Sequence, residues 1–134
     1  MRGLIVCAEP VELILLGRKT WEIRGQKTAP GPIALIQSGS STVVGTADLV
    51  AVHGPLTAAE LARTENKHRI AELQKGEFKD RKRRKSKRGG QDGLPYPMTY
   101  AWELGNVKRL KKPVPYKHPY GAVIWVRLPD DLLD

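Results

Sequence analysis

Cysteine is nearly absent from this 134-residue chain, which contains only Cys7. A single cysteine excludes an internal disulfide, and neither it nor the three histidines follow the spacing of a structural zinc site. Cys7 ends the short apolar run of residues 3–7, which is typical of a small core residue rather than a reactive thiol. We therefore expect no bound metal and no cofactor.

Long hydrophobic runs are also missing. A membrane-spanning helix needs about 20 consecutive apolar residues, whereas the longest run here, residues 11–16, already contains Glu12. The apolar stretch near the N-terminus is too short for a signal peptide, because Glu9 and Pro10 end it. These absences predict a soluble, cytoplasmic protein without membrane contact. The hydrophobic content of 40% still suffices for the core of one domain over residues 1–134.

Acidic residues are few, and the resulting net charge of +9 is concentrated in one place. Residues 79–88 hold eight basic residues against one acid, a net +7, which leaves +2 for the rest of the chain. We expect this segment to lie in a solvated loop at about residues 76–97. The loop is either a flexible or localisation-like tract or a contact surface for nucleic-acid phosphates. The candidate phosphate contacts are Arg81, Lys82, Arg83, Arg84, Lys85, Lys87 and Arg88.

Apolar alternation and breakers predict the order of the secondary structure. The predicted strands cover residues 3–7, 20–24, 33–37, 42–52, 100–107 and 122–128. The predicted helices cover residues 10–16, residues 57–62, and a restart or continuation over residues 66–74. Because helices and strands do not alternate regularly, a parallel doubly wound sheet is disfavoured. We expect an α+β fold, a small mixed or antiparallel β-barrel of about six strands flanked by two or three helices.

Residues 17–24 combine charge with strand spacing. Lys19 follows the glycine that ends the first helix, and Glu22 and Arg24 stand two apart on one face of the next strand. On a solvated face they form an ordinary ion pair, worth about 0–1 kcal/mol. In a cleft, Arg24 would hold Glu22 ionised, and Lys19 would be a mobile cation at the mouth for a phosphate or carbonyl oxygen. The spacing leaves both interpretations open.

The pattern G-x-K-x-x-E-x-R over residues 17–24 resembles the signature of ASCH (activating signal cointegrator homology) domains. Further segments resemble the family in the same order. They are the opening strand and helix at residues 3–17, the strand and polar turn at residues 33–39, residues 101–104 and residues 113–116. The resemblance covers nearly the whole chain except the basic segment.

This resemblance implies a barrel related to the PUA domain, an RNA-binding fold. It also implies that Lys19, Glu22 and Arg24 line a cleft between barrel and helix that takes RNA or a nucleotide-like ligand. Gln37 and Ser38, at the polar turn, join them as candidate ligand contacts. DNA stays open as an alternative nucleic acid.

Two family branches have described activities, which makes a hydrolase the main alternative. One branch hydrolyses the acetyl amide of N4-acetylcytidine with a lysine, a threonine and a glutamate. Lys19 matches that lysine, Glu22 occupies the threonine position, and Glu72 repeats the glutamate spacing after Lys67 and His68. Lys19, Glu22 and Glu72 are therefore the candidate catalytic residues, although the missing threonine counts against this activity.

The other branch is described as a ribonuclease, but this sequence has no paired-carboxylate metal site and no histidine pair for acid–base cleavage. A third hypothesis is an interaction domain whose basic segment binds an acidic partner. Aromatic residues offer a further clue, because exposed rings stack on the bases of single-stranded RNA. The rings that could stack in this way are Tyr96, Tyr100, Trp102, Tyr116 and Tyr120, although we expect most of them to pack in the barrel or at its rim.

Overall fold

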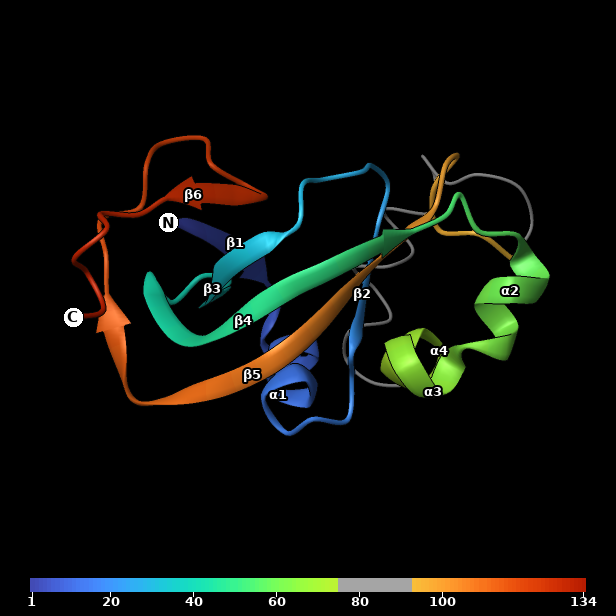
Figure 1. The fold of residues 1–134 in the computed structure, drawn as a ribbon, viewed down its shortest axis with the longest axis horizontal. Coiled ribbons are helices and arrows are strands. Elements are labelled where there is room, and N and C mark those ends of the chain that lie inside the picture. The colour runs from blue at the N-terminus through green and yellow to red at the C-terminus, as the bar shows by residue number, and fades with distance from the viewer. Residues whose placement is uncertain (75–92) are drawn as a thin grey trace.

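The structure, a computed structural model, describes residues 1–74 and 93–134. Six strands form one sheet in the order β2-β5-β4-β3-β1-β6, which curls into a half-barrel (Figure 1). The strands are β1 Arg2–Val6, β2 Trp21–Arg24, β3 Gly31–Gln37, β4 Thr42–His53, β5 Tyr100–Pro115 and β6 Trp125–Arg127. The helices are α1 Ala8–Leu15, α2 Ala58–Arg63, α3 Glu65–His68 and α4 Ile70–Gln74.

The sheet is mixed, since β1 pairs in parallel with β3 while every other strand pair is antiparallel. The expected α+β class with about six strands is confirmed. The curl does not close, because β2 and β6 remain the two edges of the sheet. The described residues contain four short helices rather than two or three. None of these helices has the length and apolar character needed to span a membrane.

Apolar packing fixes the helices against the sheet in two places. Val11 and Ile14 of α1 pack with buried side chains of β1, β3, β4 and β5 in the main core. A second cluster joins Trp21 and Ile23 of β2 to Ile70 of α4 and to α2. Complete burial of such a side chain contributes roughly 1.5–3 kcal/mol. The end of α1, the start of β2 and the α3–α4 pair are thereby held close together.

Two strands differ in length from the sequence-based expectation. β5 continues through Pro113 to Pro115, although residues 100–107 were the predicted strand. The extension tolerates proline because β2 pairs only with the Tyr100–Glu103 part of β5, so the far half has one open edge. β6 is shorter than the predicted residues 122–128, since it pairs with β1 over three residues only.

The predicted helical stretch at residues 66–74 is divided. α3 ends at His68, and Arg69 has a left-handed backbone with φ of 62° before α4 begins. The capping box at Thr57 and Glu60 is present at the start of α2, as predicted. The break at Arg69 matters for the site, because it ends a helix beside the first residues of β2.

Candidate functional site

The turn that ends α1 directs Lys19 towards the protein interior. Gly17 has φ of 78°, a conformation that glycine adopts without steric cost. Its N–H donates to the carbonyl of Ile14 at 3.0 Å, and the Arg18 N–H donates to the carbonyl of Leu13 at 2.9 Å. These two bonds form a Schellman motif, which stops the helix and reverses the chain. Lys19, two residues after the glycine, consequently enters the protein instead of extending into solvent.

Lys19 is buried, with 2% of its surface exposed. Its Nζ donates to the carbonyl oxygens of Trp21 at 2.8 Å and His68 at 2.6 Å, and lies 3.3 Å from Glu22 Oε1. His68 is the last residue of α3, where backbone carbonyls lack partners within the helix. The expectation of a mobile cation at the mouth is therefore wrong, because three oxygens hold this ammonium in place.

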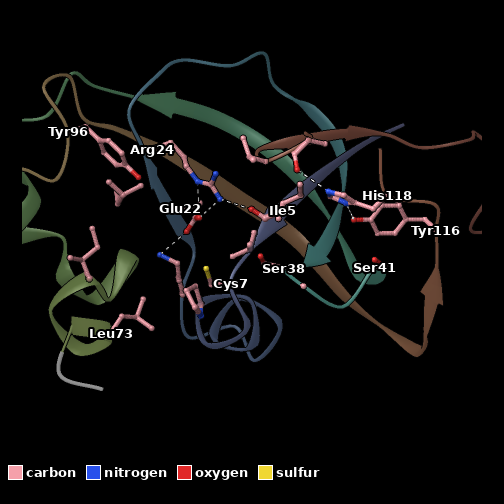
Figure 2. Close-up of a pocket in the computed structure, with 18 residues that line it drawn as sticks. Ile5, Cys7, Glu22, Arg24, Ser38, Ser41, Leu73, Tyr96, Tyr116 and His118 are labelled. Atoms are coloured by element: carbon pink, nitrogen blue, oxygen red, sulfur yellow. Dashed lines mark hydrogen bonds and ion pairs between the residues drawn. The ribbon is translucent and has the colours of Figure 1, made fainter. Parts of the chain in front are cut away.

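Glu22 and Arg24 continue the same network (Figure 2). Glu22 Oε2 accepts hydrogen bonds from Arg24 Nε at 3.0 Å and from Nη2 at 2.8 Å. Nη2 also donates to the carbonyl of Ile5 at 2.9 Å, and the guanidinium lies 5.6 Å from the centre of the Trp102 ring. Lys19, Glu22 and Arg24 thus form one continuous cluster, which we call the charged triad.

The charges of the triad determine its protonation. Burial acts to raise the pKa of Glu22, but the charges of Arg24 and Lys19 and their hydrogen bonds outweigh it and lower the pKa to about 2. Burial lowers the pKa of Lys19, and the Glu22 carboxylate opposes that shift. Glu22 is therefore ionised at neutral pH.

One donor of the triad remains available to a ligand. Arg24 Nη1 makes no hydrogen bond within residues 1–74 and 93–134. Every buried side-chain nitrogen or oxygen in the described part of the chain has a partner, so this nitrogen must reach open space. The other guanidinium nitrogens hold the group in a fixed orientation. The arrangement presents a rigid cationic donor to any acceptor that enters.

The open space beside the triad is a cavity of about 410 Å³. This volume falls within the roughly 300–1,000 Å³ range of small-molecule and cofactor sites. The cavity lies between β1, the start of α1, the charged triad and α4, with Tyr96 near one end and Tyr116 and His118 at the other (Figure 2). The polar residues that line it are Lys19, Glu22, Arg24, Ser38, Ser41, Tyr96, Tyr116 and His118.

Comparison with known proteins identifies the family. Residues 4–114 match the ASCH domain. This chain belongs to the ASCH domain family. The match includes the turn at Gly17 and the whole charged triad. No curated protein matches the chain.

Solved structures of an ASCH protein from Zymomonas mobilis share the fold. One superposes with a TM-score of 0.61 at 19% sequence identity, over 85% of this chain and 72% of that chain. A serine-to-alanine mutant of the same protein gives 0.63 at 17% identity, over 96% and 88% of the two chains. A tyrosine-to-phenylalanine mutant gives 0.60 at 20% identity, over 85% and 74%. At identities below 25%, these superpositions show a shared fold and nothing more.

The candidate residues of this ASCH domain divide into three groups. The charged triad and Ser38 line the cavity, whereas Gln37 does not. Glu72 also lies outside it, on the surface of α4, where its carboxylate is 3.5 Å from the Arg18 guanidinium. The basic candidates Arg81, Lys82, Arg83, Arg84, Lys85, Lys87 and Arg88 lie outside the described residues. Among the candidates that the structure describes, only the charged triad and Ser38 share one surface.

The sequence anticipated only some of the aromatic residues and histidines that line the cavity. Tyr100 and Trp102 are core residues, 7% and 0% exposed, so these two rings are not available to stack on bases. Tyr96 lines the cavity, and burial raises the pKa of its hydroxyl. His118 also lines the cavity, although its distance in sequence from the other histidines gave no sign of this. Its position two residues after Tyr116 is a common pattern and does not single it out in the sequence.

Metal ligation finds no support within the described ranges. Residues 1–74 and 93–134 contain no group of three or more His, Cys, Asp or Glu side chains that could hold a metal ion. His68 is engaged in the fold, since its Nε2 lies 2.7 Å from the carbonyl of Leu61 and its Nδ1 accepts from the Ile70 N–H.

Proposed function

We propose that this ASCH domain binds RNA and receives one of its nucleotides, or a modified nucleoside, in the cavity beside the charged triad. The observation that carries this proposal is Arg24 Nη1, a donor without a hydrogen-bond partner among residues 1–74 and 93–134, on a residue that lines a cavity of about 410 Å³. Membership of a family with an RNA-binding, PUA-like fold supports the same ligand class.

The triad suits an oxygen-rich, anionic ligand. A guanidinium is a planar donor whose geometry matches phosphate and carbonyl oxygens. Arg24 is already oriented by Glu22 and Ile5, so little side-chain freedom is lost when a ligand binds. Lys19 has a supporting role, because its ammonium already contacts three protein oxygens. The ligand then contacts Arg24, while Lys19 keeps Glu22 in place.

The basic segment at residues 79–88 supplies sequence-independent affinity in this proposal. Its net charge of +7 suits contacts to backbone phosphates, which position a nucleic acid without reading its sequence. The cavity would then select the nucleotide. A binding measurement can distinguish these two effects, which are selection of the nucleotide by the cavity and salt-dependent attraction by the basic segment.

The test is the binding of a labelled single-stranded RNA to the full chain and to two arginine variants. R24Q should weaken binding at least tenfold, since a hydrogen bond to a charged group is worth about 1.5–3 kcal/mol. R109Q is the matched control, because Arg109 also pairs with a carboxylate, Glu12, but on the exposed surface outside the cavity. It should change the affinity less than twofold.

A second variant tests the proposal independently in case R24Q does not fold. Ser38 is exposed, lines the cavity and makes no side-chain hydrogen bond within the described ranges, so S38L should fill the space without disturbing the triad. It should also weaken RNA binding, with an unchanged thermal unfolding curve. Full affinity in both R24Q and S38L would refute the proposal. The recovered RNA, and a parallel sample of N4-acetylcytidine, should be intact after incubation, and cleavage of either would favour the hydrolase alternative.

A further inference from the structure

The end of the cavity away from the charged triad carries several side-chain hydroxyl groups. Tyr116 and Ser41 lie there with His118, across Ile5 from Glu22 and Arg24, and Ser38 lies beside Ile5 (Figure 2). The cavity lining contains no Asp, Glu, Lys or Arg apart from the charged triad. The cavity therefore has a cationic end and a hydroxyl-rich end, which suit different parts of one ligand.

The hydrogen bonds of His118 determine what Tyr116 can offer. His118 Nε2 lies 2.9 Å from the carbonyl oxygen of Ala122, which only accepts, so Nε2 carries the hydrogen. In the neutral imidazole Nδ1 is then an acceptor, and the Tyr116 hydroxyl, 2.7 Å away, donates to it. With its only hydrogen engaged, the Tyr116 oxygen presents lone pairs alone. It is a fixed acceptor and needs a donor from the ligand.

The neighbouring serines complete this surface. The Tyr116 N–H donates to the carbonyl of Ser41 at 3.1 Å, which holds the end of β5 against the turn after β3. The hydroxyls of Ser38 and Ser41 are exposed and make no side-chain hydrogen bond among the described residues. Each can donate and accept. One fixed acceptor beside two adaptable hydroxyls is unsuited to a phosphate, which offers no donor, and matches a pair of sugar hydroxyls.

We propose that the Tyr116 oxygen accepts a hydrogen bond from the 2′-hydroxyl of a bound ribonucleotide, and that this contact distinguishes RNA from DNA. The inference rests on the proposed function, since it assigns one part of the ligand to each end of that same cavity. Arg24 contacts a phosphate or base oxygen, and Tyr116, oriented by His118, contacts the sugar. The 2′-hydroxyl is the group that separates the two nucleic acids.

The experiment compares one sequence as RNA, as its uracil-containing deoxy counterpart, and as 2′-O-methyl RNA. The full chain should bind the RNA about three- to tenfold more tightly than the other two, the range expected for one neutral hydrogen bond. Y116F should lose that advantage through weaker RNA binding, with deoxy binding unchanged. The penalty from methylation should vanish in Y116F, because the two changes remove the same contact.

Y120F is the matched control, since Tyr120 is fully exposed and does not line the cavity. It should keep the preference of the unaltered protein for RNA. If Y116F lowers RNA and deoxy binding equally, Tyr116 reads a base or only braces the loop, and the inference fails. It also fails if Y116F changes neither. In both cases the loss of binding in R24Q and S38L would leave the proposed function standing, whereas retained binding in those two variants would refute it.

Discussion

Glu22 is the residue on which the charged triad depends. Its carboxylate lies between Lys19 and Arg24, 3.3 Å from the first and 2.8 Å from the second. A buried ion pair is costly to break, because the remaining partner is left charged and dehydrated. Removing this one negative charge would leave the buried Lys19 and the partly buried Arg24 close together without a counter-charge. The stability that the triad gives the fold and the pH dependence of that stability therefore both come from the Glu22 carboxylate.

Substitution of this carboxylate should show both effects. A pKa of about 2 in the folded protein, against an ordinary value of 4.5, means that Glu22 stabilises the fold fully above pH 4.5 and progressively less as the pH falls towards 2. E22Q should unfold more easily at neutral pH, by roughly 3–5 kcal/mol. The difference in free energy of unfolding between the unaltered protein and E22Q should shrink between pH 5 and pH 2, measured by denaturant titration.

The matched control for E22Q is E12Q. Glu12 also pairs with an arginine, Arg109, but both side chains are about half exposed. Such a surface pair is worth about 0–1 kcal/mol, so E12Q should remain close to the unaltered protein at neutral pH. A difference between E22Q and the unaltered protein that stays constant from pH 5 to pH 2 would show that Glu22 is not the ionised centre of the triad.

At the residue scale, the sequence predicted which side chains converge but not their exposure. The spacing of Glu22 and Arg24 on one strand placed them on the same face, and the structure has them hydrogen bonded. The burial of Lys19 could not be predicted, because one of its acceptors is the carbonyl of His68, 49 positions away. Local spacing contains no information about a helix end supplied by a distant segment.

At the scale of elements, local signals predicted where helices begin and end better than how long the strands are. The glycine after α1 and the capping box of α2 depend on neighbouring residues alone, and both are present. The lengths of β5 and β6 depend on how far β2, β4 and β1 run beside them, which is tertiary information. Prolines at residues 113 and 115 marked an edge or extended segment correctly, but not its continuity with β5.

The Tyr116–His118 pair belongs to the same scale. It lies just after the end of β5, and the chain returns to the sheet only at β6. Its place in the cavity follows from the pairing of Thr42 with Pro115, which brings the end of β5 beside the turn after β3. An aromatic residue and a histidine two apart are an unremarkable pattern in sequence. Only the long β4–β5 pair makes them part of a site.

For the whole molecule, charge is unevenly distributed, and this predicts two kinds of variant. Replacing the eight basic residues of the segment at 79–88 with serine and glutamine should lower RNA affinity and flatten the slope of log affinity against log salt. R24Q should lower affinity with little change in slope, since it removes one contact. Binding measured from low to moderate salt distinguishes them. An unchanged slope in the neutralised variant would assign the segment to another partner, which competition by an acidic peptide would test.

The central claim is that RNA occupies the cavity beside the charged triad, and nuclear magnetic resonance during an RNA titration locates the ligand most directly. Addition of a short single-stranded RNA to isotope-labelled protein should shift the side-chain Nε–H signal of Arg24 and the backbone amides of Ser38 and Ser41, which line the cavity. The side-chain amide of Asn106, which lies outside it near Asp48, should stay unchanged. Saturable binding that shifts other surfaces and leaves Arg24, Ser38 and Ser41 unmoved would contradict the account.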